Sequence, residues 1–402
     1  MTTPGQETRS STGDTNGTVE NPRASSITHL VTERAVIVCC GSGGVGKTTV
    51  SAAIALQAAM QGRKACVVTI DPARRLANSL GIEALSNTPH LIEGSWPGQL
   101  SALMLDPKGT FDDLIGRHAA STEQAQRILD NRIYRNLTSA LSGTQEYMAM
   151  EKLYELTEEG GFDLVVVDTP PTRNALDFLN APRRLSRFLE HRLFQLLLVP
   201  TKTYLRAVSM ATQALLRTLS KVAGADIVAD AVAFFQAFEG MEEGFALRAG
   251  RVAKLLSEPA TAFVLVTSPR KDTVVEAEWF ADKLREASLS VEGLVVNRVQ
   301  PNFETTEELP DAPEGSPLAS LIDNVHELQA VSAREATALS QLSERISPSP
   351  VVLVPLLDSD VHDISGLTIL ANHLFPISAS QTTPAAPRPA RQRPQAPKRP
   401  AD

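Results

Sequence analysis

The sequence predicts an α/β protein built on a doubly wound, mostly parallel β-sheet. Short runs of consecutive apolar residues alternate along the chain with longer segments in which apolar residues recur at helical spacing. A strand that is apolar on both faces is buried on both faces, which is typical of a parallel sheet covered by helices on each side. We expect such strands at 35–40, 64–70, 100–105, 163–167, 261–267, 291–296 and 351–356.

The segments between these strands predict the covering helices. A helix at 48–61 links the strands at 35–40 and 64–70, so these three elements form a parallel β-α-β unit. Longer helical insertions at about 111–160 and 181–258 would form a helical layer inserted between sheet strands. Later helices are expected at about 274–287, 321–345 and 364–374.

Composition narrows the class of protein. The chain has 402 residues, 43% hydrophobic and 21% charged, as in ordinary globular proteins. A net charge of −8 gives no basic field, so we expect no specific nucleic-acid partner. Three cysteines, with no C-x-x-C pair, predict neither a disulfide framework nor a zinc site. With no secretory signal and no membrane-spanning apolar run, the sequence predicts a cytoplasmic protein.

The two ends of the chain differ in composition from its middle. Residues 1–33 are rich in Ser, Thr, Gly and Asn, and we expect them to be a disordered extension. Residues 377–402 predict a disordered, basic, proline-rich tail. Peripheral membrane contact through this tail stays an open alternative. The folded domain is expected to occupy 34–376.

The loop after the strand at 35–40 carries the pattern G-x-x-x-x-G-K-T at 41–48. Glycines let backbone N–H groups approach phosphate oxygens, and the helix that follows directs its positive end at the anion. Lys47 would reach the β- and γ-phosphates, and the Thr48 hydroxyl would coordinate Mg²⁺. The predicted phosphate-binding residues are Gly43, Gly44, Val45, Gly46, Lys47, Thr48 and Thr49.

A second interpretation of this loop is a dinucleotide site. Gly41, Gly43 and Gly46 also spell G-x-G-x-x-G, and Asp71 follows at the distance of a ribose-binding acid. A dinucleotide loop does not require the lysine and threonine after its last glycine, whereas a triphosphate loop requires both. The sequence therefore favours a nucleoside triphosphate.

Two aspartates follow other predicted strands and would lie at the same edge of the sheet. Asp168 comes after four apolar residues, the arrangement that holds Mg²⁺, commonly through a water. Asp71 is a candidate to orient the attacking water, and a turn-starting Asp-Pro pair is the alternative interpretation.

The three loops together, 41–49, 71–73 and 168–172, resemble the ArsA-type ATPase family. That family belongs to the deviant Walker A class of P-loop NTPases and includes the arsenite-pump ATPase and the ATPase that targets tail-anchored membrane proteins. The resemblance covers roughly 34–375. It implies ATP and Mg²⁺ as ligands, and a water positioned by Asp71. It also implies that Asn297, Pro355 and Leu356 flank the adenine.

The sequence departs from the class at one position. Deviant Walker A loops carry a lysine after the first glycine that reaches the partner's phosphates, and here this residue is Ser42. We therefore expect a heterodimer with a paralogue that keeps the lysine, resembling the paired ATPase genes of actinobacteria, with a homodimer as the alternative. Arg74, Arg75 and Arg173 are candidates to replace the missing cation, with ordinary surface arginines as the alternative interpretation.

The resulting hypothesis is a Mg²⁺-dependent ATPase that acts as a dimeric, nucleotide-driven switch. The alternative is an ATP-binding regulatory subunit with little hydrolysis of its own. A client-binding targeting factor or an arsenite-pump ATPase is less well supported, because the zinc-binding cysteines of one branch and the cysteine cluster of the other are missing from the sequence.

Overall fold

A computed structural model of the chain describes residues 24–71, 74–132, 134–135, 144–170, 226, 230, 233–234, 236–301 and 310–376. The strands in this part of the chain are β1 (Val36–Cys40), β2 (Lys64–Thr69), β3 (His90–Ile92), β4 (Gln99–Met104), β5 (Leu164–Asp168), β6 (Thr261–Thr267), β7 (Val291–Val299) and β8 (Val351–Pro355). The helices are α1 (Ala24–Glu33), α2 (Lys47–Met60), α3 (Arg75–Leu80), α4 (Pro107–His118), α5 (Thr122–Leu129), α7 (Thr144–Tyr154), the π-helix η1 (Glu155–Glu159), α13 (Glu242–Ser257), α14 (Lys271–Glu286), α15 (Pro317–Ile346) and α16 (Ile364–Leu374).

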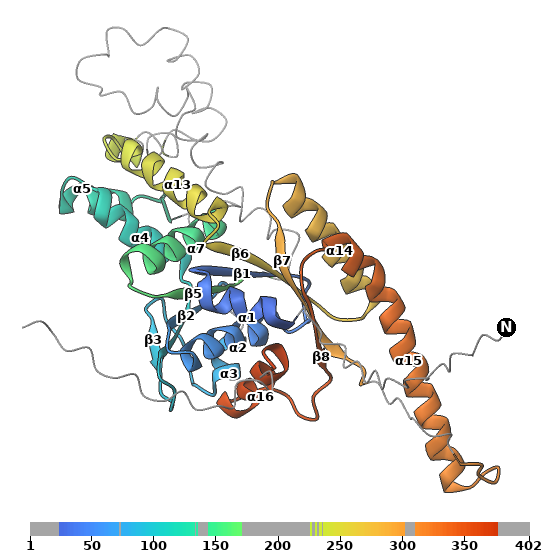
Figure 1. Cartoon of the computed structure of the whole chain (residues 1–402). Helices are drawn as coiled ribbons and strands as arrows, with labels where there is room; N and C mark the ends of the chain where they lie inside the picture. Colours follow the sequence, from blue (N-terminus) through green and yellow to red (C-terminus); the bar gives the residue numbers. More distant parts are fainter. Residues whose placement is uncertain are drawn as a thin grey trace, which may run out of the picture.

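The strands form one sheet in the order β3-β4-β2-β5-β1-β6-β7-β8 (Figure 1). Every neighbouring pair is parallel except β3 and β4. The predicted doubly wound, mostly parallel α/β sheet is confirmed. The sequence did not predict β3, which is a three-residue edge strand with one buried residue and therefore lacks a continuous apolar run.

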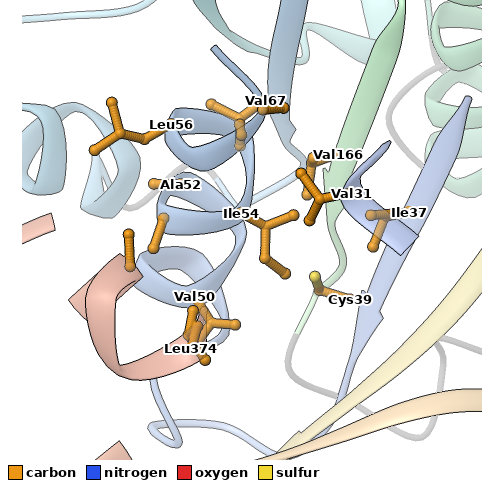
Figure 2. Close-up of a cluster of buried hydrophobic side chains, with 14 of the residues drawn as sticks. Val31, Ile37, Cys39, Val50, Ala52, Ile54, Leu56, Val67, Val166 and Leu374 are labelled. Atoms are coloured by element: carbon orange, nitrogen blue, oxygen red, sulfur yellow. The ribbon is translucent and has the colours of Figure 1, made fainter. Parts of the chain in front are cut away.

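The sheet separates two hydrophobic cores, because successive strand residues point to opposite faces. Ile37 and Cys39 of β1 face the core formed with α1, α2, α3 and α16, part of which Figure 2 shows. Val36, Val38 and Cys40 face the core formed with α7, α13, α14 and α15. Helices on both faces explain why the strands are apolar throughout.

One expectation for the N-terminal extension is wrong. Residues 24–33 were expected to be disordered with the rest of 1–33, but they form α1. Ile27, Leu30 and Val31 of this helix are between 0% and 4% exposed and join the core above α2. Their i, i+3, i+4 spacing gives the helix an apolar face in a segment that is polar on average. Residues 1–23 and the predicted tail at 377–402 lie outside the described residues.

Part of the predicted helical layer is described. The insertion expected at 111–160 contains α4, α5, α7 and η1, which pack with α13 at one end of the molecule (Figure 1). Most of the insertion expected at 181–258 lies outside the described residues. Among the described helices, none is both long and apolar enough to cross a membrane.

Candidate functional site

The loop between β1 and α2 has a backbone that only glycine adopts easily. Gly41, Gly44 and Gly46 have φ angles of 151°, 78° and 90°. A Cβ on Gly41 would lie 2.0 Å from the carbonyl oxygen of Val266, and a Cβ on Gly46 would lie 2.3 Å from Nδ2 of Asn297. These glycines therefore allow the loop to fold tightly against β6 and β7. Helix α2 begins directly after the loop, so its free N–H groups face the same space.

Asp168, at the end of β5, is the central acid of the site. It is 1% exposed, and its Oδ2 accepts hydrogen bonds from the hydroxyls of Thr48 at 2.7 Å and Thr69 at 2.9 Å. Its other oxygen, Oδ1, is buried and has no hydrogen-bond partner among the described residues. Parallel pairing produces this arrangement, because Asp168 lies in register with Thr69 of β2 and Cys39 of β1.

Lys47 and Asp168 are buried together with opposite charges. Lys47 is 6% exposed, and its Nζ donates to the carbonyl oxygen of Ser42 at 2.6 Å. Burial lowers the pKa of Lys47, while Asp168 and other groups oppose this shift. Burial raises the pKa of Asp168, and the Thr48 and Thr69 hydroxyls and Lys47 oppose it. Burying each charge costs free energy. A bound phosphate near the lysine and a bound cation near the aspartate would reduce that cost.

The residues around Asp168 fit a magnesium ion. Mg²⁺ prefers hard oxygen ligands, and it commonly binds through one or two carboxylates together with substrate phosphates and waters. The Thr48 hydroxyl and the Oδ1 of Asp168, which has no hydrogen-bond partner among the described residues, are such ligands.

The three cysteines of the chain are all buried in the strands, where burial raises the pKa of each thiol to about 12.

A cavity of about 430 Å³ extends from this acid along the carboxyl edge of the sheet. Its polar lining suits a charged ligand. The predicted site residues that line it are Gly44, Gly46, Lys47, Thr48, Thr49, Asp71, Asp168, Asn297, Pro355 and Leu356. Two other loop residues lie outside this lining: Gly43 is exposed, and Val45 is buried beneath the loop.

Asp71 lies in the cavity beside a basic residue. Its Oδ2 is 3.5 Å from Nη1 of Arg75, and its backbone N–H donates to the Thr69 hydroxyl at 3.2 Å. Of the predicted candidates, Arg75 lines the cavity, whereas Arg74 lies outside the lining, and both arginines are exposed. Arg74 has a left-handed φ of 54° where the chain turns into α3. Arg173, the other candidate, lies outside the described residues.

Ser42, which stands in the place of the class lysine, is turned away from the cavity. It is 6% exposed, and its hydroxyl donates to Glu276 of α14. It is not part of the cavity lining. The structure therefore gives Ser42 a contact between the loop and α14 and does not place its hydroxyl against a ligand in the cavity.

Sequence reasoning missed several cavity residues. Arg298 follows the predicted Asn297 and lines the cavity, and the β8–α16 loop adds Ser359, Asp360 and Val361. A polar Asn-Arg pair directly after an apolar strand was the available signal for Arg298. The acidic residues that follow the predicted strand at 351–356 were the available signal for Asp360, but their irregular spacing favoured a solvated loop over a ligand site.

Comparison with known proteins agrees with this geometry. The family model described as "Anion-transporting ATPase" matches residues 34–376. The chain belongs to the Anion-transporting ATPase family. This assignment confirms the predicted resemblance to ArsA-type ATPases and supports the prediction of an ATP-hydrolysing enzyme.

Individual relatives are also similar to this chain. "ATPase get3" of Aspergillus terreus is 30% identical over 169 residues, which cover 42% of this chain and 48% of that protein. The alignment thus spans about half the length of that relative. "ATPase get3" of Schizosaccharomyces japonicus is 25% identical over 338 residues, covering 83% of this chain and 90% of the relative. "ATPase ASNA1 homolog 2" of Paramecium tetraurelia is 25% identical over 344 residues, covering 81% and 89%.

Proposed function

We propose that the chain is a Mg²⁺-dependent ATPase that converts ATP and water to ADP and phosphate. The supporting observation is the buried Asp168, whose Oδ2 is bonded to Thr48 and Thr69 and whose Oδ1 has no hydrogen-bond partner among the described residues. This acid lies at the base of a polar cavity that also contains a buried lysine. A dinucleotide site would have no use for this combination of lysine, threonine and carboxylate.

Each residue has a proposed role. Lys47 and the loop N–H groups would bind the phosphates, and Thr48 and Asp168 would hold the metal ion, the aspartate through a water. When bound, Mg²⁺ supplies positive charge to the phosphoryl oxygens. Asp71, which lines the cavity 3.5 Å from Arg75, orients the attacking water. Pro355 and Leu356, which also line the cavity, are proposed to flank the adenine.

The role of Asp71 can be tested by D71N. We expect turnover to fall by at least about 100-fold, because an amide orients water poorly, while ATP affinity changes less than about twofold. Single-turnover phosphate release measures the first effect, and calorimetric titration of ATP measures the second. The matched control is D272N, which alters a surface aspartate that also pairs with an arginine. Unchanged turnover in D71N would contradict the assignment.

We further propose that the chain works as a nucleotide-driven dimer with a paralogue that keeps the class lysine. The supporting observation is that Ser42 is neutral, buried and bonded to Glu276. The second candidate function, an ATP-binding regulatory subunit, rests on the same residue. Hydrolysis by the isolated chain and by the chain mixed with a lysine-bearing paralogue separates the two. A symmetric dimer of this chain alone with normal turnover would contradict the heterodimer.

A nucleotide panel tests the choice of ligand. Under the proposed function, ATP and ADP raise the melting temperature in the presence of Mg²⁺, and NAD does not. Stabilisation by NAD without dependence on Mg²⁺ would instead favour the dinucleotide interpretation.

A further inference from the structure

The end of β7 contacts the phosphate loop at two consecutive carbonyl groups. Nδ2 of Asn297 donates to the carbonyl oxygen of Val45 at 2.9 Å, and Nη1 of Arg298 donates to that of Gly44 at 3.2 Å. Two neighbouring residues of β7 thus hold two neighbouring residues of the loop. Asn297 is 252 positions from Val45 in the chain, and Arg298 is 254 positions from Gly44.

The backbone at the end of β7 is shaped for this contact. Neighbouring residues of a regular strand point to opposite faces, so they could not both reach the same loop. Here the pairing of β7 with β8 shifts register between Val296 and Val299, and Arg298 has a left-handed φ of 62°. The N–H of Arg298 also donates to Oδ1 of Asn297 at 3.0 Å, which holds the amide with its Nδ2 toward the loop.

The loop is shaped to receive Asn297. This side chain is only 9% exposed, and a Cβ on Gly46 would lie 2.3 Å from its Nδ2. Gly46 therefore serves two purposes: its φ of 90° turns the chain into α2, and its lack of a side chain leaves room for the amide.

Peptide geometry links these contacts to phosphate binding. In a planar trans peptide, the carbonyl and the N–H of the next residue point in opposite directions. Arg298, by holding the carbonyl of Gly44, directs the N–H of Val45 away from itself. Asn297 does the same for the N–H of Gly46 by holding the carbonyl of Val45. A series of N–H groups fixed in this way forms an anion-binding concavity.

We propose that Asn297 and Arg298, here called the loop clamp, are positioning residues that hold the phosphate loop in its anion-binding shape before nucleotide arrives. This inference rests on the proposed function, since it takes nucleotide phosphates as the ligand. It adds a second role for Asn297, acting through the loop, to the expected contact with adenine. The clamp therefore affects phosphate binding whether or not a base is attached.

Inorganic tripolyphosphate, which has no base, separates the two roles of Asn297. We would titrate the full chain with tripolyphosphate and with ATP, each with Mg²⁺, by calorimetry. The variants are R298M, which removes the donor and keeps side-chain length, and N297L, which removes the amide at similar volume. We expect each to weaken binding of both ligands about tenfold, as for loss of one charge-assisted or buried hydrogen bond. R298K, which keeps a cationic donor, should recover most of the affinity.

The control is R334M, because Arg334 also donates to a backbone carbonyl, that of Ala330 at 3.1 Å, but lies on α15 outside the cavity. Weaker ATP binding with unchanged tripolyphosphate binding would overturn the clamp in favour of base recognition. Weaker tripolyphosphate binding in R298M but not in folded N297L would also overturn it, in favour of a direct charge effect. If N297L does not fold, an unchanged tripolyphosphate affinity in R298M still overturns the clamp. A wild-type chain that binds neither ligand would instead overturn the proposed function itself.

Discussion

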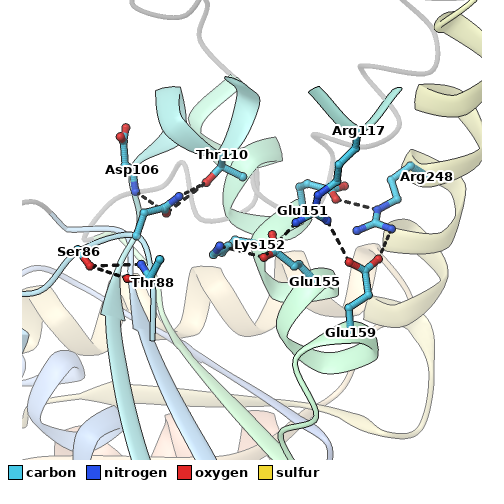
Figure 3. A network of polar contacts seen from close by, with 11 residues as sticks. Ser86, Thr88, Asp106, Thr110, Arg117, Glu151, Lys152, Glu155, Glu159 and Arg248 are labelled. Atoms are coloured by element: carbon cyan, nitrogen blue, oxygen red, sulfur yellow. Dashed lines mark hydrogen bonds and ion pairs between the residues drawn. The ribbon is translucent and has the colours of Figure 1, made fainter. Parts of the chain in front are cut away.

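Two buried carboxylates, Asp168 and Glu151, share a degree of burial but differ in their partners. Asp168 is 1% exposed and Glu151, on α7, is 2% exposed, and each has one oxygen without a hydrogen-bond partner among the described residues. Oε1 of Glu151 accepts a hydrogen bond from Nε of Arg248 on α13 at 2.7 Å (Figure 3). The carboxylate of Asp168 accepts, among the described residues, from the hydroxyls of Thr48 and Thr69.

Further ion pairs surround Glu151 and Arg248. Arg248 also donates to Glu159 at 2.6 Å and lies 4.3 Å from the ring centre of Tyr154. Arg117 pairs with Glu155 at 3.2 Å and with Glu159 at 3.0 Å. Figure 3 shows these side chains joining α4, α7, η1 and α13. Lys152 pairs with Glu155 at 3.1 Å as a third cation, so the cluster compensates the charge of its three glutamates and connects the helical layer.

Burial raises the pKa of both acids, yet with different consequences. The charge of Glu151 is balanced by Arg248, a cation that belongs to the protein itself. We therefore interpret Glu151 as a structural acid. Asp168 has neutral hydroxyls as its direct partners and faces an open cavity, so its charge is available to a bound cation. The comparison shows that the partner, more than burial itself, separates a structural acid from a functional one.

The largest expected effect is on catalysis, in D168N. An amide cannot hold a divalent cation as a carboxylate does, so we expect Mg²⁺-dependent hydrolysis to fall by at least about 100-fold. The melting temperature should change little, because the removal of a costly buried charge is offset by the loss of the opposite charge near Lys47. Phosphate release and thermal unfolding measure the two effects. Undiminished hydrolysis would show that Asp168 is no more functional than Glu151.

The second effect is on stability, in R248M. This change leaves Glu151 buried without its cation, and we expect a loss of about 3 kcal/mol in the free energy of unfolding. Chemical denaturation measures the loss. The control is R251M on the same helix, where an exposed arginine is replaced and the change should stay within about 0.5 kcal/mol. A loss in R248M no larger than in this control would refute the structural role.

The smallest expected effect is the pH dependence of the difference in unfolding free energy between wild type and E151Q. Burial raises the pKa of Glu151 above its ordinary value of 4.5, so the folded state holds this proton more tightly. Its stabilising contribution is fully present below about pH 4.5 and is lost as the pH rises through the raised pKa. The difference in unfolding free energy between wild type and E151Q should therefore fall with rising pH, with hydrolysis changed less than about twofold.

A matched variant of the same cluster should show the opposite slope. The hydrogen bond from Arg248 is the main reason that the pKa of Glu159 is lowered. Its contribution is present above the ordinary pKa of 4.5 and is lost as the pH falls through the lowered value. The difference between wild type and E159Q should rise with pH. Denaturation curves at several pH values check both predictions. If the two differences in unfolding free energy changed with pH in the same direction, the opposite pKa shifts of Glu151 and Glu159 would be contradicted.

Local sequence determined the parts of the site that depend on short-range patterns. The glycines of the phosphate loop follow from a backbone that other residues do not adopt easily, and the loop with Lys47 and Thr48 is continuous in the chain. Asp168 was predictable because it ends a continuously apolar strand. The strand at 261–267 and the helix at 364–374 were predicted at the bounds that the structure has, since their apolar patterns are unbroken.

Tertiary structure decided which residues meet across the chain. Arg298 reaches Gly44, Ser42 bonds to Glu276, and Arg248 pairs with Glu151, although each pair is separated by 97 or more positions. Helix α1 is a similar case, because its three apolar residues matter only when α2 lies beneath them.

The sequence by itself thus determined the sheet, the phosphate loop and the acid that faces it, because each depends on the conformational preferences of neighbouring residues. Only the tertiary structure decided that Glu151 is compensated while Asp168 is available, and that β7 holds the loop. These outcomes depend on the order of strands and on the packing of side chains from distant segments, which no local pattern encodes.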